Sequence, residues 1–189
     1  ECRGGRILQI TDEIGRRTQY RYAGEYLADV VHTDEGITHY EYDENGHIMS
    51  VTDQNGSRYI ENEYDEKGRI TRQGFTNGLY QIFTYDDVHR RNTIYYSETG
   101  KTEIYEYNDQ FLTERTIYDD GTCKSFEYSD DNRKTGETSR SGHRKEWEYD
   151  TFGRTIREKS PDGYEVRHEY DKNHDLVRTW DTDGDTVCL

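Results

Sequence analysis

The chain has 189 residues and a formal net charge of −15, and 30% of its residues are hydrophobic while 34% are charged. The excess of Asp and Glu argues against direct binding to nucleic acid or to an anionic membrane surface, whereas it suits solubility and a basic partner. No stretch approaches the ~18 apolar residues that a membrane-spanning helix needs.

Tyrosine and glycine recur with one period along the whole chain. A series of anchor tyrosines, most of them followed by Asp, advances in steps of 20 to 22 residues: Tyr22, Tyr42, Tyr64, Tyr85, Tyr107, Tyr128, Tyr149 and Tyr170. A glycine series advances in the same steps: Gly15, Gly36, Gly56, Gly78, Gly100, Gly121, Gly142, Gly163 and Gly184. Because two residue types keep one period, we interpret the sequence as a repeat array.

In chain order, each repeat predicts a strand, a first turn, a second strand and a second turn. The first turn reads Asp-x-x-Gly, as at 43–46, 65–68 and 150–153, where Asp can bond the backbone two residues on and Gly tolerates positive φ. The second turn ends at the glycine series. The segments between turns have about six to eight residues rich in Tyr, Ile, Thr and Val, which predicts short strands.

The strand period assigns side chains to two faces, because successive residues of a strand point to opposite sides. The anchor tyrosine and the residue two before it share one face. This aromatic face, a ladder for packing or for a partner, is predicted to carry Tyr40, Tyr42, Tyr64, Phe83, Tyr85, Tyr105, Tyr107, Phe126, Tyr128, Trp147, Tyr149 and Tyr170. The opposite face is predicted to carry an acidic ladder of Glu41, Glu63, Glu106, Glu127, Glu148 and Glu169.

Stacked glutamates would repel one another unless basic side chains lie between them. The sequence does not show which bases pair with which glutamates. The candidates are Arg58, Arg69, Arg154, Arg157 and Arg167.

These patterns predict an all-β fold, an antiparallel meander of about nine β-hairpin repeats of ~21 residues that forms a long twisted or spiralling sheet. We expect one repeat array over residues 1–189, least regular at 1–35 and at 107–113, where the first turn lacks its glycine. The exposed edges of such a sheet could also pair two copies of the chain into a homodimer.

The repeat explains most residues that could otherwise suggest chemistry. The segment DTDGD at 181–185 resembles a short calcium loop, but it falls on a second turn of the repeat, and we interpret it as an ordinary turn. Carboxylates recur in every unit, whereas a catalytic pair would be unique. No HExxH motif accompanies the seven histidines. We therefore expect no enzyme, no cofactor and no metal site.

The three cysteines, Cys2, Cys123 and Cys188, form no CxxC pair, so a disulfide framework is not expected. A bond between Cys2 and Cys188 would need the two termini to meet.

The segments EYDENGH, EYDEKGRI and EYDTFGRTI resemble the YD repeat, also called the Rhs repeat, and this resemblance covers essentially the whole chain. In that family, many repeats form a spiralling β-sheet shell in bacterial Rhs polymorphic toxins, in the cocoon of insecticidal toxin complexes and in animal teneurins. In the bacterial toxins the shell encloses a cytotoxic domain.

The resemblance leaves alternatives open. A complete shell needs far more repeats, and the DPxG-type motif that closes an Rhs core is absent. We expect a non-enzymatic protein–protein module that binds, neutralises or encloses a basic toxin domain. The chain would be cytoplasmic as a stand-alone acidic antitoxin, and secreted or on the cell surface as a shell segment. An extracellular adhesin-like repeat that recognises glycan or cell wall is the alternative.

Overall fold

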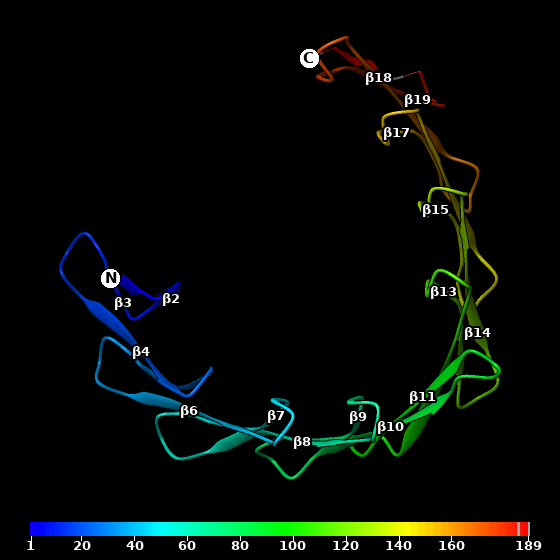
Figure 1. The fold of residues 1–189 in the computed structure, drawn as a ribbon. Coiled ribbons are helices and arrows are strands. Elements are labelled where there is room, and N and C mark those ends of the chain that lie inside the picture. The colour runs from blue at the N-terminus through cyan, green and yellow to red at the C-terminus, as the bar shows by residue number, and fades with distance from the viewer. Residues whose placement is uncertain (185, 189) are drawn as a thin grey trace. The chain divides into compact units, whose positions relative to one another are not determined.

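The structure of the chain, a computed structural model, describes residues 1–184 and 186–188. These residues form strands and no helix, joined by short loops in chain order (Figure 1). The strands are β1 (Cys2–Arg3), β2 (Arg6–Ile7), β3 (Gln9–Thr11), β4 (Arg17–Ala23), β5 (Tyr26–Val31), β6 (Ile37–Tyr42), β7 (Ile48–Thr52), β8 (Arg58–Tyr64), β9 (Ile70–Gly74), β10 (Tyr80–Asp86), β11 (Arg91–Tyr96), β12 (Lys101–Tyr107), β13 (Thr113–Tyr118), β14 (Cys123–Tyr128), β15 (Lys134–Thr138), β16 (Arg144–Tyr149), β17 (Thr155–Lys159), β18 (Glu165–Tyr170), β19 (Leu176–Asp181) and β20 (Thr186–Cys188). Among the described residues there is no helix that could span a membrane.

The chain divides into two compact units. Unit 1 comprises Glu1–Thr84 and Ile94–Lys101, and unit 2 comprises Tyr85–Thr93 and Thr102–Leu189. In unit 1, β1 pairs with β2, and each strand from β3 to β10 pairs antiparallel with the next. In unit 2, each strand from β12 to β20 does the same. The predicted all-β class and antiparallel meander are confirmed, while the single array over 1–189 stays a prediction.

Asp43 organises the turn between β6 and β7. Its carboxylate oxygen Oδ1 accepts hydrogen bonds from the backbone N–H groups of Asn45 and His47 at 2.9 and 2.8 Å. The N–H of Asp43 donates to the carbonyl of His47 at 2.9 Å. Gly46 has φ of +86°, the left-handed conformation that glycine adopts at little cost. Aspartate therefore supplies acceptors for backbone donors that the turn leaves unpaired.

The same side-chain bonds to the second and fourth following N–H groups recur along the chain. They are made by Asp12, Asp53, Asp65, Asn108, Asp150 and Asp171. Where glycine is missing, another residue takes the positive φ: Arg90, Phe111, Asn132 and His174. The turn at 108–112 thus keeps its geometry without glycine.

One glycine of the predicted series lies elsewhere in its turn. Glu35 has φ of +68°, so the left-handed residue of this turn precedes Gly36 by one position. Gly36 meets a different constraint, because a Cβ there would lie 1.8 Å from the side-chain oxygen of Gln54.

A β-bulge precedes the anchor tyrosine in both units. In the β6–β7 pair, Glu41 faces Ser50 but Tyr42 faces Ile48, so Met49 has no partner across the ladder. Equivalent register shifts lie before Tyr22, Tyr64, Tyr107, Tyr128, Tyr149 and Tyr170. A bulge strengthens the local twist and ends regular pairing. Strand alternation alone did not predict it.

Few side chains in this sheet are fully buried. Val30 and Val51 are the buried hydrophobic residues of the described chain, and all twelve residues of the predicted aromatic face are half-buried. The residues between the aromatic ones are more exposed, as the alternation predicts. Contacts between neighbouring strands therefore stabilise the sheet, in place of a central hydrophobic core.

We predict that Gly153→Ala destabilises the protein more than Gly163→Ala. Both glycines have positive φ, which costs an alanine about 1–2 kcal/mol, but they differ in surroundings. A Cβ at Gly153 would lie 2.5 Å from the Arg133 guanidinium, whereas at Gly163 it would meet nothing within 4 Å. Displacing the guanidinium from the aromatic ring beneath it adds about 0.5–1 kcal/mol. Urea unfolding of the two variants would check this, and equal losses would contradict it.

Candidate functional site

The anchor tyrosines connect consecutive repeats through their hydroxyl groups. The Tyr170 hydroxyl donates to the Thr155 carbonyl at 3.0 Å, and the Tyr149 hydroxyl donates to the Lys134 carbonyl at 2.8 Å. Equivalent bonds join Tyr22 to Ile7, Tyr64 to Ile48 and Tyr128 to Thr113. Each acceptor precedes its tyrosine by 15 or 16 residues. The tyrosine thus reaches a strand of the preceding repeat.

The tyrosine hydroxyl bond takes the place of a backbone hydrogen bond between the two strands. Regular pairing between β17 and β18 ends at Arg157 and Arg167, so the Thr155 carbonyl lies beyond it. A half-buried carbonyl without a donor would cost about 1–3 kcal/mol. The Tyr170 hydroxyl provides that donor, which explains why the repeat needs tyrosine rather than phenylalanine.

The basic residue that follows the first turn covers the next anchor tyrosine. The Arg154 guanidinium lies 4.5 Å from the centre of the Tyr170 ring. Its Nε donates to an Asp150 carboxylate oxygen at 2.7 Å, and its Nη1 donates to the Asp171 carbonyl at 3.5 Å. One guanidinium therefore joins the turn it follows to the ring and the backbone of the next repeat.

Other repeats contain the same arrangement. Arg133 lies 5.9 Å from the Tyr149 ring centre and donates to the Asp150 carbonyl at 3.3 Å. The His47 ring stacks on Tyr64 at 4.8 Å. We call this place, between the anchor ring and the two flanking turns, the arginine slot. Sequence reasoning missed it, although the Gly-Arg pair at the end of the first turn was a signal.

The predicted acidic ladder is exposed except for half-buried Glu106, and arginines lie beside most of its members. The Arg144 guanidinium binds both Glu127 oxygens, at 2.6 and 2.7 Å. The other ion pairs are Glu41 with Arg58, Glu63 with Arg72, Glu106 with Arg91 and Arg115, and Glu148 with Arg157. Glu169 faces Arg178 across the ladder. Arginine charges thus reduce the repulsion between the glutamates.

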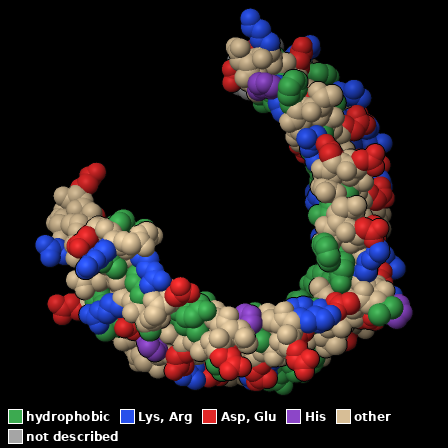
Figure 2. Space-filling view, viewed as in Figure 1, with side chains coloured by type: hydrophobic (Ala, Val, Ile, Leu, Met, Phe, Trp, Pro, Cys, Tyr) green, Lys and Arg blue, Asp and Glu red, His purple; other side chains and the backbone are tan. Residues whose placement is uncertain are grey.

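The five arginines named as partners for this ladder bind three kinds of partner. Arg58 and Arg157 bind ladder glutamates, and Arg167 contacts Glu165 at 3.4 Å. Arg69 and Arg154 instead bind turn aspartates. Figure 2 shows Lys and Arg side chains interspersed with Asp and Glu on the visible surface.

Ion pairs also lie on the aromatic face. Glu137, opposite Phe126 in the ladder, binds the ammonium groups of Lys124 and Lys134 at 2.8 and 2.7 Å. Lys134 also lies 4.6 Å from the Trp147 ring centre. The hydrogen bonds from the two lysines lower the pKa of Glu137 from 4.5 to about 2. On the other face, Arg157 lowers the pKa of Glu165 to about 2.

The most exposed hydrophobic side chains lie at turns, and one of them, Phe111, stacks on Tyr107 of the aromatic face at 5.8 Å. Val88 is 86% exposed and Phe111 is 81% exposed, and Ile14 and Phe152 are also largely accessible. Strand alternation does not predict the exposure of these turn residues.

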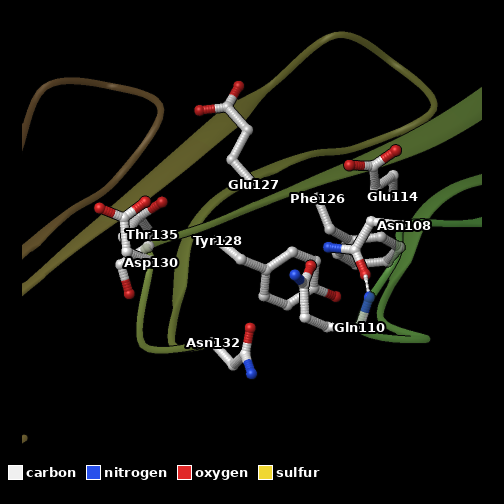
Figure 3. A pocket seen from close by; sticks show the side chains of 10 residues that line it. Asn108, Gln110, Glu114, Phe126, Glu127, Tyr128, Asp130, Asn132 and Thr135 are labelled. Atoms are coloured by element: carbon white, nitrogen blue, oxygen red, sulfur yellow. Dashed lines mark hydrogen bonds between the residues drawn. The ribbon is translucent and has the colours of Figure 1, made fainter.

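A hollow of about 520 Å³ lies in unit 2 beside the anchor tyrosine Tyr128. Figure 3 shows the Phe126 and Tyr128 rings near the side chains of Asn108 and Gln110, with Asn132 on the following turn. A second hollow of about 490 Å³ in unit 1 is lined by turn residues that include His32 and Asp53, and by Tyr59.

Within the described residues, no group of three or more His, Cys, Asp or Glu side chains could hold a metal ion. In the segment 181–185, the Asp181 carboxylate accepts bonds from the Asp183 N–H and the Tyr164 hydroxyl, while Asp185 lies outside the described residues. Cys2 and Cys123 are free thiols, and the Cys188 side chain lies outside the described part.

No protein-family model and no curated protein matches the chain, but solved structures do. A chain of the TcdB2–TccC3–Cdc42 crystal structure superposes on 97% of this chain with a TM-score of 0.73 and 10% identity. A chain of TcdB2–TccC3 without its hypervariable C-terminal region superposes on 98%, with a TM-score of 0.54 and 13% identity. A chain of the Photorhabdus luminescens Tc holotoxin pore superposes on 94%, with a TM-score of 0.52 and 13% identity.

This chain spans 11%, 12% and 10% of the length of those three chains, respectively. At these identities the likeness shows the fold alone. It supports the YD-repeat resemblance at the level of the fold.

We predict that the Glu137 ion pairs make stability depend on pH in acid. Because the folded pKa lies below 4.5, this contribution is complete above about pH 4.5 and is lost as the pH falls toward about 2. Glu137→Gln should cost about 1 kcal/mol at pH 7 and should flatten the decline of the melting temperature between pH 4.5 and 2.

The control is Glu66→Gln, at an exposed turn position, which should keep the acid decline of the parent protein. Thermal melts of the three proteins at several pH values would show the difference. An unchanged slope for Glu137→Gln would refute the assignment.

Proposed function

We propose that the chain is a non-enzymatic repeat module of a bacterial toxin system. Its sheet would form a segment of a shell that encloses a basic toxin domain. The observation that carries this proposal is the superposition of 97% of the chain on part of a TcdB2–TccC3 chain. As part of such a shell, the module would be secreted or carried on the cell surface.

The distribution of contacts supports a structural and binding role. The aspartate turn, the bulge, the tyrosine bond and the arginine slot recur from repeat to repeat. A catalytic site needs a constellation that differs from its surroundings, whereas these groups are periodic and hold neighbouring repeats together. Because so few residues are buried, large areas of the sheet remain accessible to a partner.

The charge of the chain favours a basic partner. The 40 Asp and Glu residues outnumber the 25 Lys and Arg residues, and exposed glutamates accompany the arginines of the acidic ladder. Complementary charge speeds encounter and selects among partners. A stand-alone antitoxin would use the same chemistry, so the two roles differ in whether the sheet surrounds the toxin domain or only binds it.

The proposal predicts salt-sensitive binding of basic proteins along the sheet. The probe is a small basic protein, lysozyme, and its control is succinylated lysozyme, in which the lysines carry carboxylates. Calorimetry of the full chain should show binding of the basic form at low salt, weaker binding at high salt, and no binding of the succinylated form. Hydrogen exchange should show protection that recurs from repeat to repeat.

Equal binding of the two forms, or binding of neither, would contradict a basic partner. Protection confined to one turn would contradict a shell wall. Binding to a glycan array without binding to lysozyme would instead favour an adhesin.

A further inference from the structure

The arginine slot differs at one repeat of unit 2. Leu112, Arg133 and Arg154 are spaced 21 residues apart, and each follows a first turn. Arg133 and Arg154 cover the rings of Tyr149 and Tyr170. The preceding repeat has its anchor ring but has leucine in place of arginine, so this position supplies no guanidinium to the slot.

The hollow beside Tyr128 lies at the position of that slot. Its lining includes Asn108, Gln110, Tyr128, Ser129 and Asn132. The residues 42 positions later are, in the same order, Asp150, Phe152, Tyr170, Asp171 and His174.

Those later residues are the ones that Arg154 contacts. Its guanidinium binds Asp150 and the Asp171 carbonyl, and Nη1 lies 3.3 Å from the His174 ring. It also lies 5.1 Å from the Phe152 ring centre. Five residues of the hollow therefore occupy the positions of residues that surround the Arg154 guanidinium.

We infer that this hollow is an arginine-binding subsite, which accepts the guanidinium of an arginine from a basic protein partner. The inference rests on the proposed function and specifies the chemistry of the partner. The chain itself shows that the slot holds a guanidinium at neighbouring repeats, and the volume of about 520 Å³ leaves room for the side chain and part of the adjoining backbone.

The groups around the hollow suit this occupant. The Tyr128 ring offers a π face, as Tyr170 does for Arg154. Asn108 differs from Asp150, because its side-chain oxygen is held by the N–H groups of Gln110 and Leu112 at 3.0 Å and its amide nitrogen is a donor; Figure 3 shows the first of these bonds. The Ser129 carbonyl occupies the position at which the Asp171 carbonyl accepts from Arg154.

The carboxylates at the hollow come from other positions than the Asp150 carboxylate that binds Arg154. The exposed carboxylate of Glu114 lines it, whereas the sister repeats have Thr135 and Ile156 at that position. Glu127, which also lines the hollow, is already bound by Arg144. Glu114 therefore gives the subsite an exposed carboxylate, where the slot of Arg154 has that of Asp150.

Arginine should be preferred over lysine, because a planar guanidinium can stack on a ring while its N–H groups reach several acceptors. The probes are two acetylated tetrapeptides of equal charge, one of arginine and one of lysine. Calorimetry with the full chain should show about tenfold tighter binding of the arginine peptide. NMR shifts should concentrate on Phe126, Tyr128 and Asn132.

Two substitutions at one position test the subsite directly. Leu112→Arg should fill the slot from within the chain, weaken arginine-peptide binding about tenfold and raise the melting temperature. Leu112→Met keeps a neutral side chain of similar volume and should bind the peptide as the parent does. Arg133→Met should open a second slot over Tyr149 and add a second equivalent of bound peptide.

Equal affinity for the two peptides, or unchanged binding by Leu112→Arg, would overturn the subsite. If lysozyme still binds in a salt-sensitive manner, the proposed function stands without the subsite. If the arginine peptide binds as expected and lysozyme does not, the subsite stands and the proposed shell or antitoxin role fails.

Discussion

The structure depends on one set of contacts between consecutive repeats. An anchor tyrosine and the basic residue of the preceding turn make these contacts. The Tyr170 hydroxyl binds a carbonyl of the preceding repeat while Arg154 covers its ring. The hydroxyl bond lies beyond the last regular pair of β17 and β18, Arg157 with Arg167, so it connects these strands where the ladder no longer joins them. With so few side chains buried, no central core could replace these contacts. The period of about 21 residues places each anchor tyrosine beside the turn of the preceding repeat.

These contacts between neighbouring repeats explain why the candidate function depends on the exposed faces of the sheet. Stability comes from neighbour contacts within the sheet, so much of each face stays accessible and individual turn residues can vary. The glutamates and arginines alternate across one face, and Glu137 holds two lysines on the other. A position that departs from the repeat while the fold persists is therefore informative. Leu112 is such a position, because its turn keeps the aspartate-type geometry while its slot lacks the arginine.

The sequence predicted the repeat, the antiparallel hairpins and the two faces, because turn chemistry and strand alternation are local properties. Asp43 and Gly46 behave as their residue types predict. The bulge was not predictable from alternation, since it depends on pairing between strands. The roles of Tyr170 and Arg154 also depend on residues 15 to 20 positions away in sequence. Gly36 shows the same limit, because the side chain that a Cβ there would meet, Gln54, belongs to the next second turn.

The central claim is that Arg154 and Tyr170 stabilise the sheet jointly. A double-mutant cycle of Arg154→Met and Tyr170→Leu, measured by urea unfolding, tests it most directly. We expect a coupling free energy of about 0.5–2 kcal/mol, because each substitution removes a contact that the other residue makes. Strictly additive losses would show that the two residues stabilise the sheet independently and that the claim is wrong.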